Sequence, residues 1–176
     1  MHIENVAVHG NVVTMTVAAA SVTACCPICG RCTARVHSRY QRTVADLPVS
    51  GRQVAVVAHV RRFRCLDASC PRRIFAERLP DVVAPHARKS YGLRQALTHV
   101  GFSAGGESGA RLARQVGLPT SPDTVLRLIR AAPCPDSGQP VAIGIDDWAY
   151  KRGLRYGTIV CDLERHRAID IMRVRN

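Results

Sequence analysis

The sequence predicts an α+β protein in which a β-rich region, a helical region and a second β-rich region follow one another. Runs of β-branched residues alternate with tight turns up to about residue 85. Apolar residues recur every three or four positions from Arg88 onward, and the proline-rich segment 133–140 leads into further apolar runs. We therefore expect domains at 1–85, 86–132 and 141–176, joined between the last two by a linker at 133–140.

Two β-hairpins are expected in the first region. Residues 3–24 form the first, with a turn at His9-Gly10-Asn11. The second lies between Arg35 and Arg64, turns at Ser50-Gly51 and returns through the apolar run 54–60. It ends at a cysteine, so its two ends each carry residues able to bind a metal.

Two close cysteine pairs are the strongest chemical signal. Cys26 and Cys29 lie in one tight turn, Cys65 and Cys70 lie in another, and the second hairpin joins the pairs. Four such thiolates bind one tetrahedral Zn²⁺, which predicts a zinc-ribbon-like module with structural zinc. Free core thiols, a redox Cys-x-x-Cys and another soft metal are the alternatives. The remaining cysteines are interpreted as spare thiols, because disulfides are rare in a reducing compartment: Cys25, Cys32, Cys134 and Cys161.

Three short helices are expected in the middle region. Leu93, Leu97 and Val100 mark the first helix, which we expect to end at Gly101. A second segment closes at Gly117, and Ser121 is a good N-cap for a third helix. Three short helices with a glycine-bounded turn predict a helix-turn-helix. A helical packing or oligomerisation element is the alternative.

The charge predicts a polyanionic partner. The chain carries 25 Lys and Arg residues against 13 acids, and its only lysines are Lys89 and Lys151. Arginine forms bidentate contacts with phosphate and guanine, which favours double-stranded DNA over a merely solvated basic surface. The candidate DNA-binding residues are Arg39, Arg42, Arg61, Arg62, Arg64, Arg72, Arg73, Arg111, Arg114, Ser121, Arg127 and Arg130.

The last region offers one candidate for metal-dependent chemistry. Asp146 and Asp147 are expected at the end of an apolar strand, and a second strand follows after Gly153. Ribonuclease-H-like enzymes place the first ligand of a divalent metal pair in this way. Asp also commonly ends strands because it favours turns.

No run of about 18 apolar residues is present, so we expect no membrane span and a cytoplasmic protein.

The chain resembles bacterial insertion-sequence transposases of the ISL-three family, the DDE type with an N-terminal zinc-binding region. The segments that carry the resemblance are CPICG at 26–30, RVHSRY at 35–40, DLP at 46–48, VRRFRC at 60–65, CPRRIF at 70–75, GIDDWAY at 144–150 and RYGT at 155–158. The resemblance implies strand transfer of a mobile element, with Asp146 as the first catalytic Asp and Asp147 as the alternative. It implies Mg²⁺ only for a full-length member, and it implies a bacterial protein associated with the nucleoid.

The resemblance also predicts a truncated catalytic domain. Such transposases continue with a second Asp and a Glu, whereas this chain ends at Asn176 after residues that lose the family-like pattern. We therefore expect the first β-hairpin of a truncated ribonuclease-H-like domain, inactive alone, in a chain that binds the element's terminal inverted repeats. Full-length transposase or a second copy are the candidate protein partners. The alternatives are a zinc and helix-turn-helix transcriptional regulator and an interaction protein in which DNA plays no part.

Overall fold

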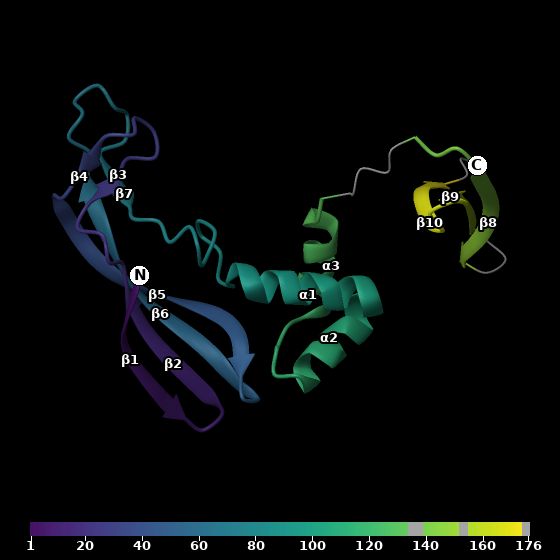
Figure 1. Cartoon of the computed structure of the whole chain (residues 1–176), viewed down its shortest axis with the longest axis horizontal. Coiled ribbons are helices and arrows are strands. Elements are labelled where there is room, and N and C mark those ends of the chain that lie inside the picture. The colour runs from purple at the N-terminus through teal and green to yellow at the C-terminus, as the bar shows by residue number, and fades with distance from the viewer. Residues whose placement is uncertain (134–138, 152–154, 174–176) are drawn as a thin grey trace. The chain divides into compact units, whose positions relative to one another are not determined.

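The computed structural model describes residues 1–133, 139–151 and 155–173 (Figure 1). The chain divides into two compact units, Met1–Ala132 and Pro133–Asn176. The first unit holds two sheets and three helices, and the second holds one sheet, so the predicted α+β class is confirmed. None of the helices in the described part of the chain is both long and apolar enough to cross a membrane.

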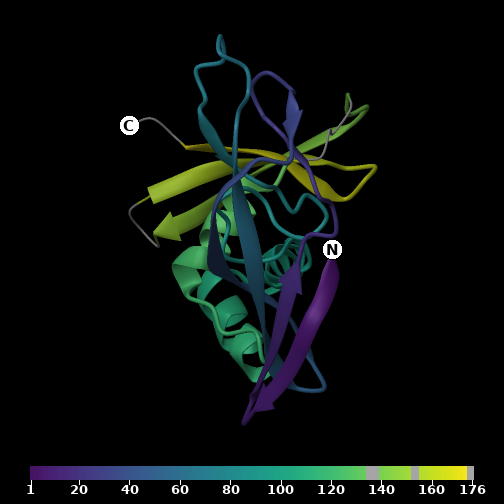
Figure 2. The ribbon, with the colours of Figure 1, turned by 90° about the vertical axis from the view of Figure 1, so that its left-hand side faces the viewer.

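One sheet dominates the first unit. Its strands are β1 (His2–His9), β2 (Val12–Ala18), β5 (Val36–Val49), β6 (Arg52–Arg64) and β7 (Ile74–Ala76). The order is β1-β2-β6-β5, with β7 paired to the end of β6 (Figure 2). The β2–β6 pair is parallel and the other pairs are antiparallel. The small remaining sheet pairs β3 (Ala24–Cys25) with β4 (Cys32–Thr33).

The long β5–β6 hairpin confirms the predicted turn at Ser50-Gly51. Both residues adopt positive φ, 49° and 74°, as a tight two-residue turn requires. The first expected hairpin is shorter than the range 3–24, because β2 ends at Ala18. Valines at alternate positions of β6 face a core with Val13, Val17 and Val44, which Val83 helps to cover. On the other face Thr43 of β5 is exposed, whereas Ala55 and Val57 of β6 are partly buried.

The helices are α1 (Tyr91–Ala104), α2 (Gly106–Gln115) and α3 (Pro122–Ala131). The expected end of the first helix at Gly101 is wrong, because α1 runs three residues further. A Cβ at Gly101 would lie 2.8 Å from a Val125 methyl carbon and 2.9 Å from Ile129, so this glycine allows α3 to approach closely. The Ser121 cap is confirmed, since its Oγ accepts a hydrogen bond from the Thr124 backbone N–H.

Backbone hydrogen bonds join the helices to the sheet at the start of α1. The Ala45 N–H donates to the Arg88 carbonyl, and the Ser90 N–H donates to the Ala45 carbonyl, each at 2.9 Å. The Ser90 hydroxyl also donates to Asp46 Oδ1 and accepts from the Leu93 N–H as the cap of α1. Residues 88–90 are therefore held in place on β5.

The second unit is a three-stranded antiparallel sheet in the order β10-β9-β8. Its strands are β8 (Ile143–Lys151), β9 (Arg155–Asp162) and β10 (Arg167–Arg173). Asp146 and Asp147 lie in the middle of β8, so their expected place at a strand end is wrong. Strand β9 pairs with β8 on both sides of the two aspartates, so β8 does not end there. Where a strand ends depends on pairing with its neighbour in the sheet, which the local sequence does not record.

Candidate metal centre and basic surface

The four predicted zinc ligands come from two turns that the long hairpin brings together. Cys26 directly follows β3, and Cys29 lies in the turn before β4; Cys65 directly follows β6, and Cys70 precedes β7. The Cys26 carbonyl accepts from the Gly30 N–H at 2.9 Å, and Gly30 has a φ of 73°, which favours glycine. The tight first turn therefore depends on the glycine that follows Cys29.

The sulfur geometry fits a tetrahedral ion. All four Sγ atoms lie within 4.8 Å of one another. Cys26 Sγ is 3.9 Å from Cys70 Sγ, and Cys29 Sγ is 3.6 Å from Cys65 Sγ. A tetrahedral Zn²⁺ with Zn–S bonds of 2.3 Å requires sulfurs about 3.8 Å apart. The four cysteines of the prediction are thus brought together at zinc-binding distances.

The electrostatics of the four thiols favour a cation. The Cys29 backbone N–H is the main cause that lowers the pKa of Cys26, to about 7. At Cys65 the Asp67 backbone N–H lowers the pKa, but burial and the neighbouring thiols outweigh it and raise the pKa to about 12. Four adjacent thiolates repel one another, and a divalent ion removes that cost by binding the deprotonated forms.

A small apolar cluster supports the cysteines. Cys26 and Cys70 are buried against Phe63 and Phe75, whose ring centroids are 6.0 Å apart. Phe63 comes from β6 and Phe75 from β7, so the cluster connects both strands to the metal centre. In the turn between Cys65 and Cys70, Asp67 accepts hydrogen bonds from the Ser69 N–H and hydroxyl, and the side-chain bond is the main cause that lowers the Asp67 pKa.

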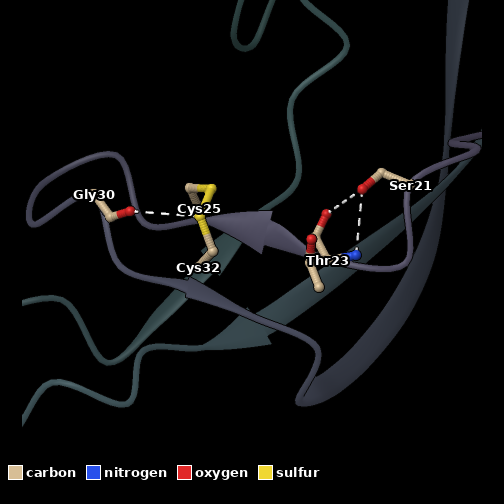
Figure 3. The surroundings of a disulfide bond; sticks show 5 residues. All are labelled: Ser21, Thr23, Cys25, Gly30 and Cys32. Atoms are coloured by element: carbon tan, nitrogen blue, oxygen red, sulfur yellow. Dashed lines mark hydrogen bonds between the residues drawn. A yellow bond between two sulfur atoms is a disulfide. The ribbon is translucent and has the colours of Figure 1, made fainter.

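Cys25 and Cys32 form a disulfide, so their interpretation as spare thiols is wrong (Figure 3). The two residues are directly opposite each other in β3 and β4, with Cα atoms 3.8 Å apart. The two cysteines are seven positions apart in the sequence, and they face each other only because the turn at Cys26–Cys29 brings β3 and β4 together. Cys161 is a free thiol, as predicted, and Cys134 lies outside the described residues.

The candidate DNA-binding arginines of the β-rich region differ in their surroundings. Arg61 pairs with the buried Glu77 carboxylate at 2.8 Å and also donates to the Ser21 carbonyl. Arg42 donates to the Ala87 carbonyl. The Arg62 guanidinium lies 4.5 Å from the Tyr40 ring centroid. The exposed members are Arg39, Arg62, Arg64, Arg72 and Arg73.

The candidates of the helical region are on the surface. Arg111, Arg114, Arg127 and Arg130 are all exposed, and Ser121 is exposed while it caps α3. Arg111 donates to the Ser108 hydroxyl and Arg127 to the Thr124 hydroxyl, each within one turn of its own helix. DNA contact by any of these twelve residues stays a prediction.

The two candidate catalytic carboxylates are not grouped with other metal ligands. Successive strand residues face opposite sides of a sheet, so Asp146 and Asp147 project in different directions. Asp147 accepts a hydrogen bond from the Thr158 hydroxyl at 2.9 Å. Within the described residues, the only group of three or more His, Cys, Asp or Glu side chains placed to hold a metal ion is the cysteine cluster.

Two buried carboxylates have structural roles that the sequence analysis did not predict, although it considered Asp162 as a possible metal ligand. Glu77 neutralises Arg61, and Asp162 accepts bonds from the Glu164 and Arg165 backbone N–H groups at the β9–β10 turn. The Asp162-Leu-Glu-Arg spacing is a recognisable turn signal, because Asp accepts hydrogen bonds from backbone N–H groups two and three residues ahead. No local signal identifies Glu77, whose partner lies 16 positions away.

Comparison with known proteins gives one match. Residues 23–70 match the zinc-finger of transposase IS204/IS1001/IS1096/IS1165, a range that includes all four cysteine ligands. No curated protein and no solved structure matches the chain. The match confirms the resemblance of the N-terminal region to ISL-three family transposases.

Proposed function

We propose that the chain binds the DNA of a mobile insertion element and acts as the recognition part of a transposase. The observation that carries this proposal is the coincidence of the transposase zinc-finger match with four cysteines at tetrahedral spacing. The excess of arginine supports it, because phosphate neutralisation supplies much of the affinity of DNA-binding proteins.

We infer that α2 and α3 act as the helix-turn-helix. The connection contains Gly117, with a φ of 78°, and α3 begins at a capped N-terminus with Pro at its first position. Asp123, Arg127 and Arg130 lie on the exposed face of α3, while Val125 is fully buried. This arrangement suits an α3 that enters the major groove while α2 lies across the backbone.

We also propose that the chain does not transfer DNA strands by itself. The β8–β9 pair suits the start of a ribonuclease-H-like sheet, with Asp146 as the family's first Asp. Two-metal chemistry needs several carboxylates around the ions, and the described residues offer no such group.

Equilibrium DNA binding tests the proposed function. Zinc-loaded protein is titrated against a fluorescent duplex of the element's terminal inverted repeat and against a scrambled duplex of equal length, over a salt series. We expect the repeat to bind about 10³-fold tighter or more, as is usual for specific readers. Equal and weak binding to both duplexes would contradict recognition of the element.

The transcriptional regulator is the second candidate, because a zinc module and a helix-turn-helix without a carboxylate metal site also suit that role. It predicts a preference for promoter DNA over the terminal repeat. If the chain is instead the recognition part of a transposase, its DNA-binding region should compete with full-length transposase for the ends of the element. Overexpression of the chain should then lower transposition frequency, and an unchanged frequency would argue for the regulator.

A further inference from the structure

A basic hollow lies between α3 and the segment that leads into α1. It has a volume of about 430 Å³ and is lined by four cations, Arg88, Lys89, Arg94 and Arg127. Ala87, Leu128 and Ala131 supply apolar wall, and none of the lining residues is acidic. A volume of this size is within the usual range for ligand sites, roughly 300–1,000 Å³.

The cations of the hollow lack acidic partners. Among the described residues, the ion pairs of Lys and Arg are Arg61–Glu77 and Arg165–Asp162, so Arg88, Lys89 and Arg94 take part in none of them. Lys89 and Arg94 are nevertheless partly buried. Like charges held together in a concave site repel one another and create a positive potential, which an anion would relieve.

The hollow is also held in a fixed shape. Residues 88–90 are bonded to β5 through Ala45, and Ser90 caps α1 at the turn that carries Arg94. On the opposite wall, Arg127 Nη2 donates to Thr124 Oγ1 at 3.2 Å. A preorganised cluster loses less conformational entropy on binding than free surface arginines do.

We propose that this hollow binds a phosphate of the DNA backbone beside the helix that reads the groove. The four cations would contact the phosphate oxygens, and the apolar wall suits the adjoining deoxyribose. This inference rests on the proposed function, and it adds Arg88, Lys89 and Arg94 to the DNA-contacting set. Contacts to the backbone position a protein on the duplex without reading its sequence.

The test compares alanine variants in the same titration. Arg88→Ala and Arg94→Ala, singly and together, are measured on the repeat and on the scrambled duplex, with Arg52→Ala as the control. Arg52 is an exposed arginine at the start of β6, outside the hollow. The double variant should weaken binding to both duplexes by a similar factor, about tenfold, and should reduce the salt slope by about 1 for each residue removed. Arg52→Ala should behave as wild type.

The outcomes separate the two proposals. Wild-type protein that binds neither duplex overturns the proposed function and this inference with it. If the double variant binds DNA as tightly as the wild type, the phosphate-binding role of the hollow is overturned and the proposed function stands. Pyrophosphate binding, in a protein whose DNA affinity the variants leave unchanged, leads to the same conclusion. Circular dichroism melting checks folding, and Arg94→Lys, which keeps the charge, should recover most of the affinity if the site holds phosphate.

Discussion

At the level of single residues, Arg61 differs from the other arginines of the β5–β6 hairpin because it has a buried carboxylate partner. Glu77 accepts from the Arg61 backbone N–H at 2.7 Å as well as from its guanidinium. The Glu77 side chain is 4% exposed and that of Arg61 is 20% exposed. Removal of one partner of such a pair leaves the other charge partly buried and uncompensated.

We expect Glu77→Ala to lower the free energy of unfolding by about 2–3 kcal/mol, since Arg61 keeps its bond to Ser21 and some access to water. Urea denaturation of the zinc-loaded protein measures this. Arg62→Ala is the matched control, and loss of its contact with Tyr40 should cost no more than about 1 kcal/mol. Similar losses in both variants would show that the buried pair has no special role.

Asp162 gives the second unit a pH dependence. The Arg165 N–H, its main hydrogen-bond donor, holds the pKa of this buried carboxyl below its usual range near 3.8. A carboxyl with a lowered folded-state pKa contributes stability above the unfolded pKa, and that contribution is lost as the pH falls through the folded value.

Asp162→Asn should therefore destabilise β8–β10 at pH 7 and have a smaller effect at the lowest pH at which the sheet still folds. Amide hydrogen exchange along β9 and β10 follows unfolding of this sheet. Asp170→Asn is the control, because Asp170 is exposed. A loss at pH 7 that persists unchanged in acid would show that the charge of Asp162 is not the cause.

At the level of elements, the disulfide and the metal constrain the same short hairpin. The Cys25–Cys32 bond joins β3 to β4, and zinc would join Cys26 to Cys29 inside the loop that the disulfide closes. A covalent closure restricts the metal-free chain, so part of the entropy that zinc binding would otherwise cost is already lost.

The Cys25→Ser/Cys32→Ser variant should consequently bind zinc about tenfold more weakly than the disulfide-bonded protein. Competition with a chelator of known affinity measures the difference, and thiol reduction of the wild-type chain should act in the same direction. Cys161→Ser should leave zinc affinity unchanged. An unaltered affinity in the double variant would mean that the turn is preorganised without the disulfide.

Local elements were predictable where one residue type satisfies one backbone requirement. The Ser50-Gly51 turn, the Ser121 cap and the spacing of the zinc ligands are signals of this kind. The parallel β2–β6 pair and the strand β10 were not predicted, because pairing between distant segments depends on register that no local pattern records. Gly101 was misinterpreted for a related reason: its role concerns a neighbouring helix rather than its own.

Across the first unit as a whole, three separate apolar clusters hold different parts of the fold. The sheet cluster contains valines of β2, β5 and β6, and the helical cluster contains Leu93, Leu97, Ala113 and Leu118. The buried members of the third cluster are Phe63, Phe75 and the candidate ligands Cys26 and Cys70, with Ala24, Val36 and Cys65 packed against them partly buried. So small a cluster buries too little apolar surface to order two loops without the ion.

Chelation of the metal should therefore unfold the zinc end and leave the rest folded. Amide hydrogen exchange should accelerate in residues 24–33 and 65–76, while amides in α1 and in the middle of β6 keep their protection. Readdition of zinc should restore the slow exchange, and Cys70→Ser should reproduce the chelated pattern even with zinc present. Loss of protection throughout the first unit would instead show that the sheet and helices depend on the metal, because cooperative units of a protein open together only when their packing is shared.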